Sequence, residues 1–69
     1  MSQLNLRING EDRSFAGIAT FAELVDALQL GGKRIAIERN GEIVPRSQHA
    51  AELLADGDVL EIVVAVGGG

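Results

Sequence analysis

The last three residues, Gly67, Gly68 and Gly69, form the segment of this 69-residue sequence where chemistry is easiest to place. Glycine has no β-carbon, so an extended glycine segment is thin enough to enter a narrow channel and to lie close to a bound nucleotide. A carboxylate at Gly69 is a poor electrophile until it is activated, for instance by adenylation. The sequence therefore predicts a substrate that carries its own reactive end, with Gly67 and Gly68 as the threading segment.

A glycine-rich end is also typical of a frayed terminus, and that interpretation stays open. Ordering the tail costs on the order of 1–2 kcal/mol per residue, so binding free energy must come from another surface. The exposed side of the preceding segment is the candidate, and we expect Val63 and Ala65 to dock the partner.

Other residues with chemical potential are more simply explained. His49 is the only histidine and lies in a polar stretch, which predicts a solvated surface side chain rather than a general base. Asp56 and Asp58 flank Gly57 as in an ordinary turn, without the further ligands that a metal site needs. We therefore expect no catalytic residue, no bound metal and no bound cofactor.

Composition narrows the class of protein further. The chain is 46% apolar with two phenylalanines and no cysteine, which allows one small aliphatic core and excludes disulfides and thiolate chemistry. A net charge of −4 argues against nucleic acid as a partner. The sequence shows no targeting or membrane-spanning segment, so we expect a cytoplasmic protein that does not bind membranes.

Hydrophobic periodicity and turn residues predict the elements that position the tail. Two Asn-Gly pairs, at positions 9–10 and 40–41, are typical of tight hairpin turns. Around them we expect four strands, at residues 3–8, 11–16, 33–39 and 42–44, with the polar strand 11–16 at an edge and Pro45 ending the last.

One main helix is expected between the hairpins. Thr20 and Glu23 form a capping box at its start, and Gly31 and Gly32 are expected to end it in a left-handed conformation. The apolar stripe behind the cap falls at helical spacing. Its members are Phe21, Leu24, Val25 and Leu28.

The remaining chain returns to the sheet. Residues 47–54 predict a short helical or irregular crossing anchored by Leu53 and Leu54, followed by a turn at 56–58. The final strand, residues 59–66, is apolar on both faces, which is typical of a central strand. Its core face is expected to include Leu60, Ile62, Val64 and Val66. Together these elements predict an α+β fold in which a mixed sheet of about five strands covers the helix with one face and leaves the other open.

Three segments resemble the ThiS family of thiamin-biosynthesis sulfur carriers. They are "NGEIVPR" at residues 40–46, "LLADGDVLEI" at residues 53–62, and the terminal Gly-Gly. The resemblance covers essentially the whole chain and implies a β-grasp, ubiquitin-like domain at residues 1–66 with a flexible glycine tail at residues 67–69. Gly67 lies where many members of the family have another small residue, and Val63 lies where some members have a bulkier, often aromatic group.

The resemblance also implies a reaction cycle. A ThiF-type enzyme would use ATP to adenylate Gly69, and a cysteine desulfurase or persulfide protein would supply sulfur for a thiocarboxylate. Thiazole synthase, ThiG, would then receive the sulfur. The chain itself would not be an enzyme.

Two alternatives remain open at this point. The chain could carry sulfur for another pathway, such as molybdopterin formation, tRNA thiolation or cysteine synthesis. It could also be a non-catalytic β-grasp interaction module with incidental glycines.

Overall fold

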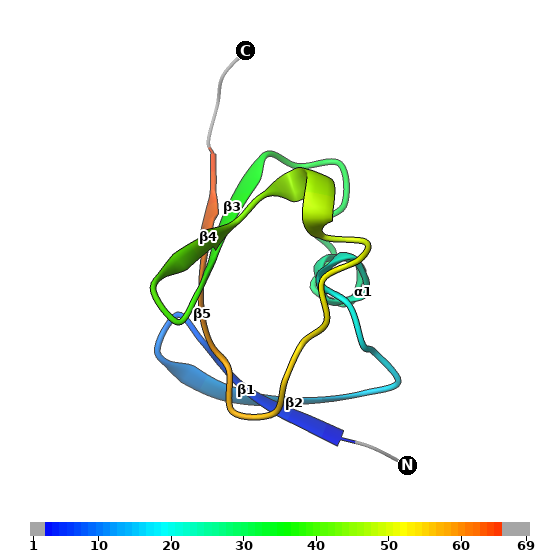
Figure 1. The fold of residues 1–69 in the computed structure, drawn as a ribbon, viewed down its shortest axis with the longest axis vertical. Coiled ribbons are helices and arrows are strands. Elements are labelled where there is room, and N and C mark those ends of the chain that lie inside the picture. Colours follow the sequence, from blue (N-terminus) through cyan, green and yellow to red (C-terminus); the bar gives the residue numbers. More distant parts are fainter. Residues whose placement is uncertain (1–2, 66–69) are drawn as a thin grey trace.

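The computed structural model describes residues 3–65 of the chain. It contains five strands in one sheet, one α-helix and one short 3₁₀ helix (Figure 1). In chain order these are β1 (Gln3–Ile8), β2 (Glu11–Ala16), α1 (Phe21–Ala27), β3 (Ile35–Arg39), β4 (Glu42–Val44), η1 (Arg46–Gln48) and β5 (Val59–Val64). This mixed sheet with one main helix is the arrangement that the sequence pattern predicted, and it agrees with the β-grasp fold that the resemblance implied.

Both Asn-Gly turns form as predicted. Asn9 and Gly10 have φ angles of 52° and 83°, and Asn40 and Gly41 have 51° and 90°. Positive φ at both central residues matches the right-handed twist of a two-residue hairpin, and asparagine tolerates it better than most side chains do. The turns therefore set the registers of β1 on β2 and of β3 on β4.

The last strand is central, as its two apolar faces indicated. The strand order is β2-β1-β5-β3-β4, with β5 parallel to β1 and antiparallel to β3. The polar strand β2 lies at one edge, and β4 lies at the other and ends directly before Pro45. The predicted final strand ran to Val66, whereas β5 ends at Val64, and Val66 lies outside the described residues.

The predicted capping box at the start of α1 is present. The Glu23 backbone N–H donates to Thr20 Oγ1, and the Glu23 carboxylate accepts from the Thr20 backbone N–H. The predicted helix end was wrong, because Gln29 (φ 60°) adopts the left-handed conformation two residues before Gly31. Its N–H donates to the Asp26 carbonyl and the Leu30 N–H donates to the Val25 carbonyl, the pattern of a Schellman cap.

The core fills the space between one sheet face and α1. Phe21 and Leu24 of the helix are fully buried against residues from β1, β3 and β5. The buried apolar set comprises Leu6, Ile8, Phe21, Leu24, Ile37, Val44, Leu54, Leu60 and Ile62. Two predicted core residues were assigned wrongly: Leu53 is 63% exposed, and Val64 is 36% exposed where β5 approaches its end.

The largest error concerns His49, which is buried rather than solvated. Its Nε2 lies 3.1 Å from the Val44 carbonyl oxygen, and its ring stacks on Phe21 with a centroid separation of 6.2 Å. Its backbone carbonyl also accepts from the Ala22 N–H at 2.9 Å. The histidine therefore fastens the segment after β4 to the start of α1, a tertiary role that its polar sequence neighbours did not indicate.

Candidate functional site: the sheet face beside the C-terminal tail

Both predicted docking residues lie exposed at the end of β5. Val63 is 64% exposed and points to the sheet face that α1 does not cover, opposite Ala36 of β3. Ala65 is also exposed, and its backbone N–H donates to the Arg34 carbonyl at 2.8 Å. The chain is thus held to the sheet as far as Ala65. The predicted threading and acceptor residues Gly67, Gly68 and Gly69 lie outside the described residues.

A shallow hollow marks this end of the open face. It has a volume of about 210 Å³. Its lining consists of Arg34, Ile35, Ala36, Val63 and Ala65. These residues come from β3, β5 and the segments at their ends, so the hollow lies directly beside the base of the tail. Its small apolar side chains can receive a protruding apolar side chain of a partner.

Side chains from both Asn-Gly turns hold β5 in place, which the sequence analysis missed. Asn9 Nδ2 donates to the Ile62 carbonyl at 3.0 Å, and Asn9 Oδ1 accepts from the Ile62 N–H at 2.8 Å. Asn40 Oδ1 accepts from the Val59 N–H at 3.0 Å. These bonds fix the register of the strand that leads into the tail. The sequence feature that could have indicated these bonds is an asparagine at a positive-φ turn position next to a central strand.

The rest of the open face mixes apolar and acidic side chains. Val59 is 47% exposed at the start of β5, and Ile43 is 60% exposed on β4. Between them, Glu38 and Glu61 lie directly opposite each other on β3 and β5. Like charges in such a cross-strand pair oppose each other, so this part of the face is less suited than the Val63 end to close apolar contact.

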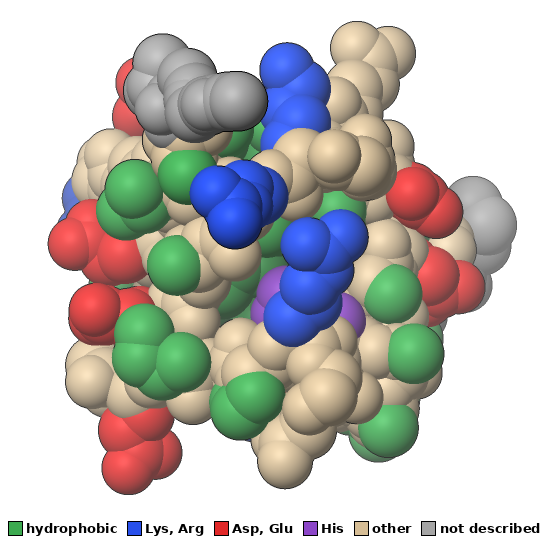
Figure 2. Space-filling model, turned by 90° about the horizontal axis from the view of Figure 1, so that it is seen from above, with side chains coloured by type: hydrophobic (Ala, Val, Ile, Leu, Met, Phe, Trp, Pro, Cys, Tyr) green, Lys and Arg blue, Asp and Glu red, His purple; other side chains and the backbone are tan. Residues whose placement is uncertain are grey.

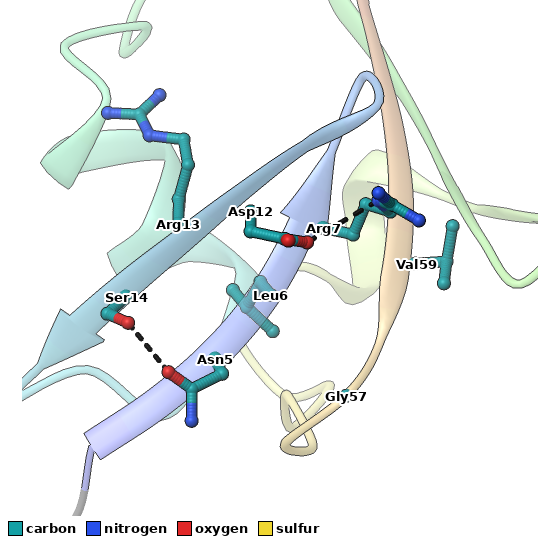
Figure 3. Close-up of a pocket in the computed structure, with 8 residues that line it drawn as sticks. All are labelled: Asn5, Leu6, Arg7, Asp12, Arg13, Ser14, Gly57 and Val59. Carbon is teal, nitrogen blue, oxygen red and sulfur yellow. Dashed lines mark hydrogen bonds and ion pairs between the residues drawn. The ribbon is translucent and has the colours of Figure 1, made fainter.

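A second hollow, of about 360 Å³, lies along β1 and β2 at the other end of β5 (Figure 3). Its polar groups already engage one another: Arg7 pairs with Asp12 at 3.4 Å, and Ser14 Oγ donates to Asn5 Oδ1 at 2.6 Å. The Arg13 side chain points away from this group (Figure 3). These side chains do not converge on a common point, so the hollow lacks the arrangement of a catalytic site.

The acidic turn at Asp56–Asp58 is structural, as predicted. Asp58 Oδ2 accepts from the Ala55 N–H at 2.9 Å, and Asp56 Oδ1 accepts from the Asn5 N–H at 2.7 Å. Gly57 supplies the positive φ of 89°. Within residues 3–65, no three His, Asp or Glu side chains are grouped so that they could hold a metal ion.

One carboxyl group is perturbed by its surroundings. Backbone N–H groups of Ala19 and Thr20, in that order of importance, lower the pKa of Glu23 below its ordinary value of 4.5. They stabilise the charged form through the hydrogen bonds of the capping box. This effect serves the helix start and lies away from the tail.

The long Arg39 side chain is likewise structural. Its guanidinium donates to the Leu53 carbonyl at 2.8 Å and to the Glu52 carboxylate, and it lies over the Phe21 ring. Asp58 is 3.7 Å away. Arg39 therefore joins β3 to the crossing segment across the edge of the core.

Membership of a known family follows from three comparisons. The model of the ThiS family matches residues 6–69. The sulfur carrier protein ThiS of Bacillus subtilis is 38% identical over 65 residues, which cover 93% of this chain and 98% of that protein. The crystal structure of the thiamine biosynthesis protein ThiS from Geobacter metallireducens superimposes with a TM-score of 0.79 at 32% identity, covering 96% of this chain and all of that one.

A larger relative has the same segment within a longer protein. The thiazole synthase of Paramagnetospirillum magneticum is 46% identical over 66 residues, which cover 96% of this chain and 20% of that protein. This chain thus spans about a fifth of the length of that relative. The family match, the full-length relative and the solved structure agree with the β-grasp geometry, and the chain belongs to the ThiS family of sulfur carrier proteins.

Proposed function

We propose that the chain carries sulfur for thiazole formation in thiamin biosynthesis as a thiocarboxylate at Gly69. A carboxylate oxygen of Gly69 attacks the α-phosphorus of ATP in a ThiF-type enzyme, and pyrophosphate leaves. The terminal sulfur of a persulfide donor then attacks the acyl carbon and AMP leaves. A thiol next attacks the donor sulfur of the resulting acyl disulfide, which breaks the S–S bond, releases the thiocarboxylate and leaves a disulfide. The chain is a carrier and not an enzyme, because the catalytic groups belong to its partners. This cycle uses ATP, and we assign it to the cytoplasm.

The observation that carries the proposal is that β5 leads into the glycine segment of the sequence. The Ala65 N–H donates to the Arg34 carbonyl of the sheet, and in the sequence Ala65 is followed by Val66 and the three glycines. Four extended residues reach at most about 14 Å. With Gly69 as the acceptor, we expect the partner's adenylation site to lie within about that distance of the surface that contacts Ala65.

Docking at the Val63 end supplies part of the free energy that ordering the glycines consumes. Val63 and Ala65 line the hollow, so a partner side chain seated there contacts the last described residue before the glycine segment. Burying the exposed two-thirds of a valine side chain is worth about 1–2 kcal/mol, or about a 5- to 30-fold change in affinity.

Three partners follow from this cycle: a ThiF-type adenylating enzyme, a sulfur donor (a cysteine desulfurase or persulfide protein) and thiazole synthase. The thiazole synthase relatives support the last of these, because they contain a similar segment within the synthase chain. This also favours thiamin over molybdopterin, tRNA or cysteine as the pathway served.

The loading reaction is tested by intact-mass measurement after incubation with a ThiF-type enzyme, ATP and a sulfur donor. The full chain should gain the mass difference between one sulfur and one oxygen atom. A chain that lacks Gly69 should fold but remain unloaded. Equal loading of both chains would show that Gly69 is not the acceptor.

The docking surface is tested separately by Val63→Asp, with Val59→Asp as the matched control on the same strand and face. A new carboxylate at the hollow should weaken binding to the ThiF-type enzyme by at least about 10-fold, whereas the control should change it little. Equal affinities for the two variants would exclude the Val63 end as the contact surface.

A further inference from the structure

The end of the molecule from which the tail leaves is basic, although the whole chain is acidic. The sequence has ten acidic and six basic residues. Lys33, Arg34 and Arg46, half of the basic residues, lie at this end and are all exposed. We call these three residues the basic patch. Figure 2 shows Lys and Arg side chains gathered on this face, with Asp and Glu side chains toward its margins.

Backbone contacts and strand register place the patch at the end of the molecule where β5 ends. The backbone carbonyl of Arg34 accepts a hydrogen bond from the Ala65 N–H, and Lys33 is the residue before Arg34. Arg46 begins η1, which follows β4 and lies at the same end of the molecule as the end of β5 (Figure 1). The strand register supports this position of Arg46. Because β4 runs antiparallel to β3 and Val44 pairs with Ile37, the chain continues from Val44 toward the end of β3 at which Arg34 lies.

The positive charges of the patch are available to a partner. Among residues 3–65, the ion pairs are made by Arg7 and Arg39, and Arg13 lies over the Phe15 ring at 5.5 Å. Within the described part of the chain, none of the three patch residues forms an ion pair. Exposed charges of one sign gathered in this way attract an oppositely charged surface and raise its association rate.

We infer that the basic patch steers the tail to an acidic surface around the tail-binding opening of the adenylating enzyme. This rests on the proposed function, which supplies the enzyme. A protein surface fits better than a nucleic acid, because a long polyanion would also meet the acidic remainder of this chain. The apolar hollow and the basic patch adjoin at Arg34, so the matching surface has an apolar contact flanked by Asp and Glu side chains.

The inference is tested with two double variants of equal charge change. Arg34→Glu with Arg46→Glu reverses the patch, whereas Arg7→Glu with Arg13→Glu alters residues near the other end of β5, since Arg7 pairs with Val59. Association with the ThiF-type enzyme is followed by stopped-flow fluorescence at low and high salt. The Arg34 backbone contact with Ala65 is unaffected by either set of changes.

At low salt, the patch variant should associate at least about 10-fold more slowly than the control variant. At about 0.5 M salt the two association rates should converge, because dissolved ions then screen charge–charge interactions beyond a few ångströms. Equal slowing of both variants would show that net charge alone matters and would overturn the inference. If the patch variant still associates more slowly than the control variant at high salt, electrostatic steering is also overturned.

Intact-mass loading of the wild-type chain with the same enzyme separates the two proposals. If the wild-type chain loads sulfur while the patch variant associates like the control, the inference fails and the proposed function stands. If the wild-type chain neither binds nor loads, both fail together.

Discussion

Replacing Asn9 by glycine is expected to loosen the central strand that leads into the tail. Asn9→Gly preserves the positive φ of 52° but removes two hydrogen bonds to the Ile62 backbone. A neutral hydrogen bond contributes about 1 kcal/mol net, and the part-buried Ile62 groups would lose their partners. The expected decrease in the free energy of unfolding is therefore about 2–3 kcal/mol.

Such a loss is large for a domain of this size. At about 4–8 °C per kcal/mol, the midpoint of thermal unfolding should fall by about 8–24 °C. Urea denaturation followed by circular dichroism measures the free energy directly. Amide hydrogen exchange should also show faster exchange at Ile62 than in the wild-type chain.

Asn40→Gly is the matched control, since it makes the same substitution at the other Asn-Gly turn. Its bond to the Val59 N–H is solvent-exposed, and its second bond, from Asn40 Nδ2 to Asp58 Oδ1, is long at 3.4 Å, so their loss should cost about half as much. The added backbone freedom of glycine in the unfolded chain is the same in both variants. A cost below about 0.5 kcal/mol for Asn9→Gly, with unchanged exchange at Ile62, would refute this account of how β5 is held.

Two further predictions concern α1. Leu24→Ala should cost about 2–5 kcal/mol, because Leu24 is fully buried in the core, and a chain this small should then be largely unfolded by circular dichroism. Glu23→Gln should reduce the loss of unfolding free energy that the wild-type chain shows as pH falls into the acid range. The folded-state pKa of Glu23 is lowered, so its stabilising effect is full above its unfolded-state pKa and is lost as pH falls through the folded-state pKa. Urea midpoints measured across pH 3 to about 6 test this, and parallel curves for variant and wild type would contradict it.

Elements specified by neighbouring residues could be predicted from the sequence. The Asn-Gly turns, the capping box at Thr20 and the central position of β5 depend on short patterns and were confirmed. Features that depend on distant contacts were missed. His49 has polar sequence neighbours, yet Phe21 and the Val44 carbonyl provide its buried environment.

The helix end shows how a local rule can choose the wrong residue. Glycine is the usual left-handed cap, so Gly31 and Gly32 were the natural choice, but Gln29 takes that role. An additional turn of helix would carry Leu30 away from Val25, whereas the cap brings the Leu30 N–H to the Val25 carbonyl at 2.9 Å. Tertiary packing, in which Leu30 joins the edge of the core, outweighs the propensity of the glycines.

The candidate site was predicted in part. Val63 and Ala65 are exposed at the end of β5 as expected, because alternation along a central strand assigns them to one face. Arg34 was not singled out, since only the pairing of β3 with β5 brings it next to Ala65. The tail residues Gly67, Gly68 and Gly69 lie outside the described residues, so their roles remain predictions.

Transfer of labelled sulfur tests the central claim most directly. The chain is loaded with a heavy sulfur isotope, purified, and incubated with thiazole synthase and its other substrates. Mass spectrometry should find the label first in the peptide that ends at Gly69 and then in the thiazole product, with a matching loss from the peptide. Thiazole that forms without the label, while the chain keeps its sulfur, would contradict the account.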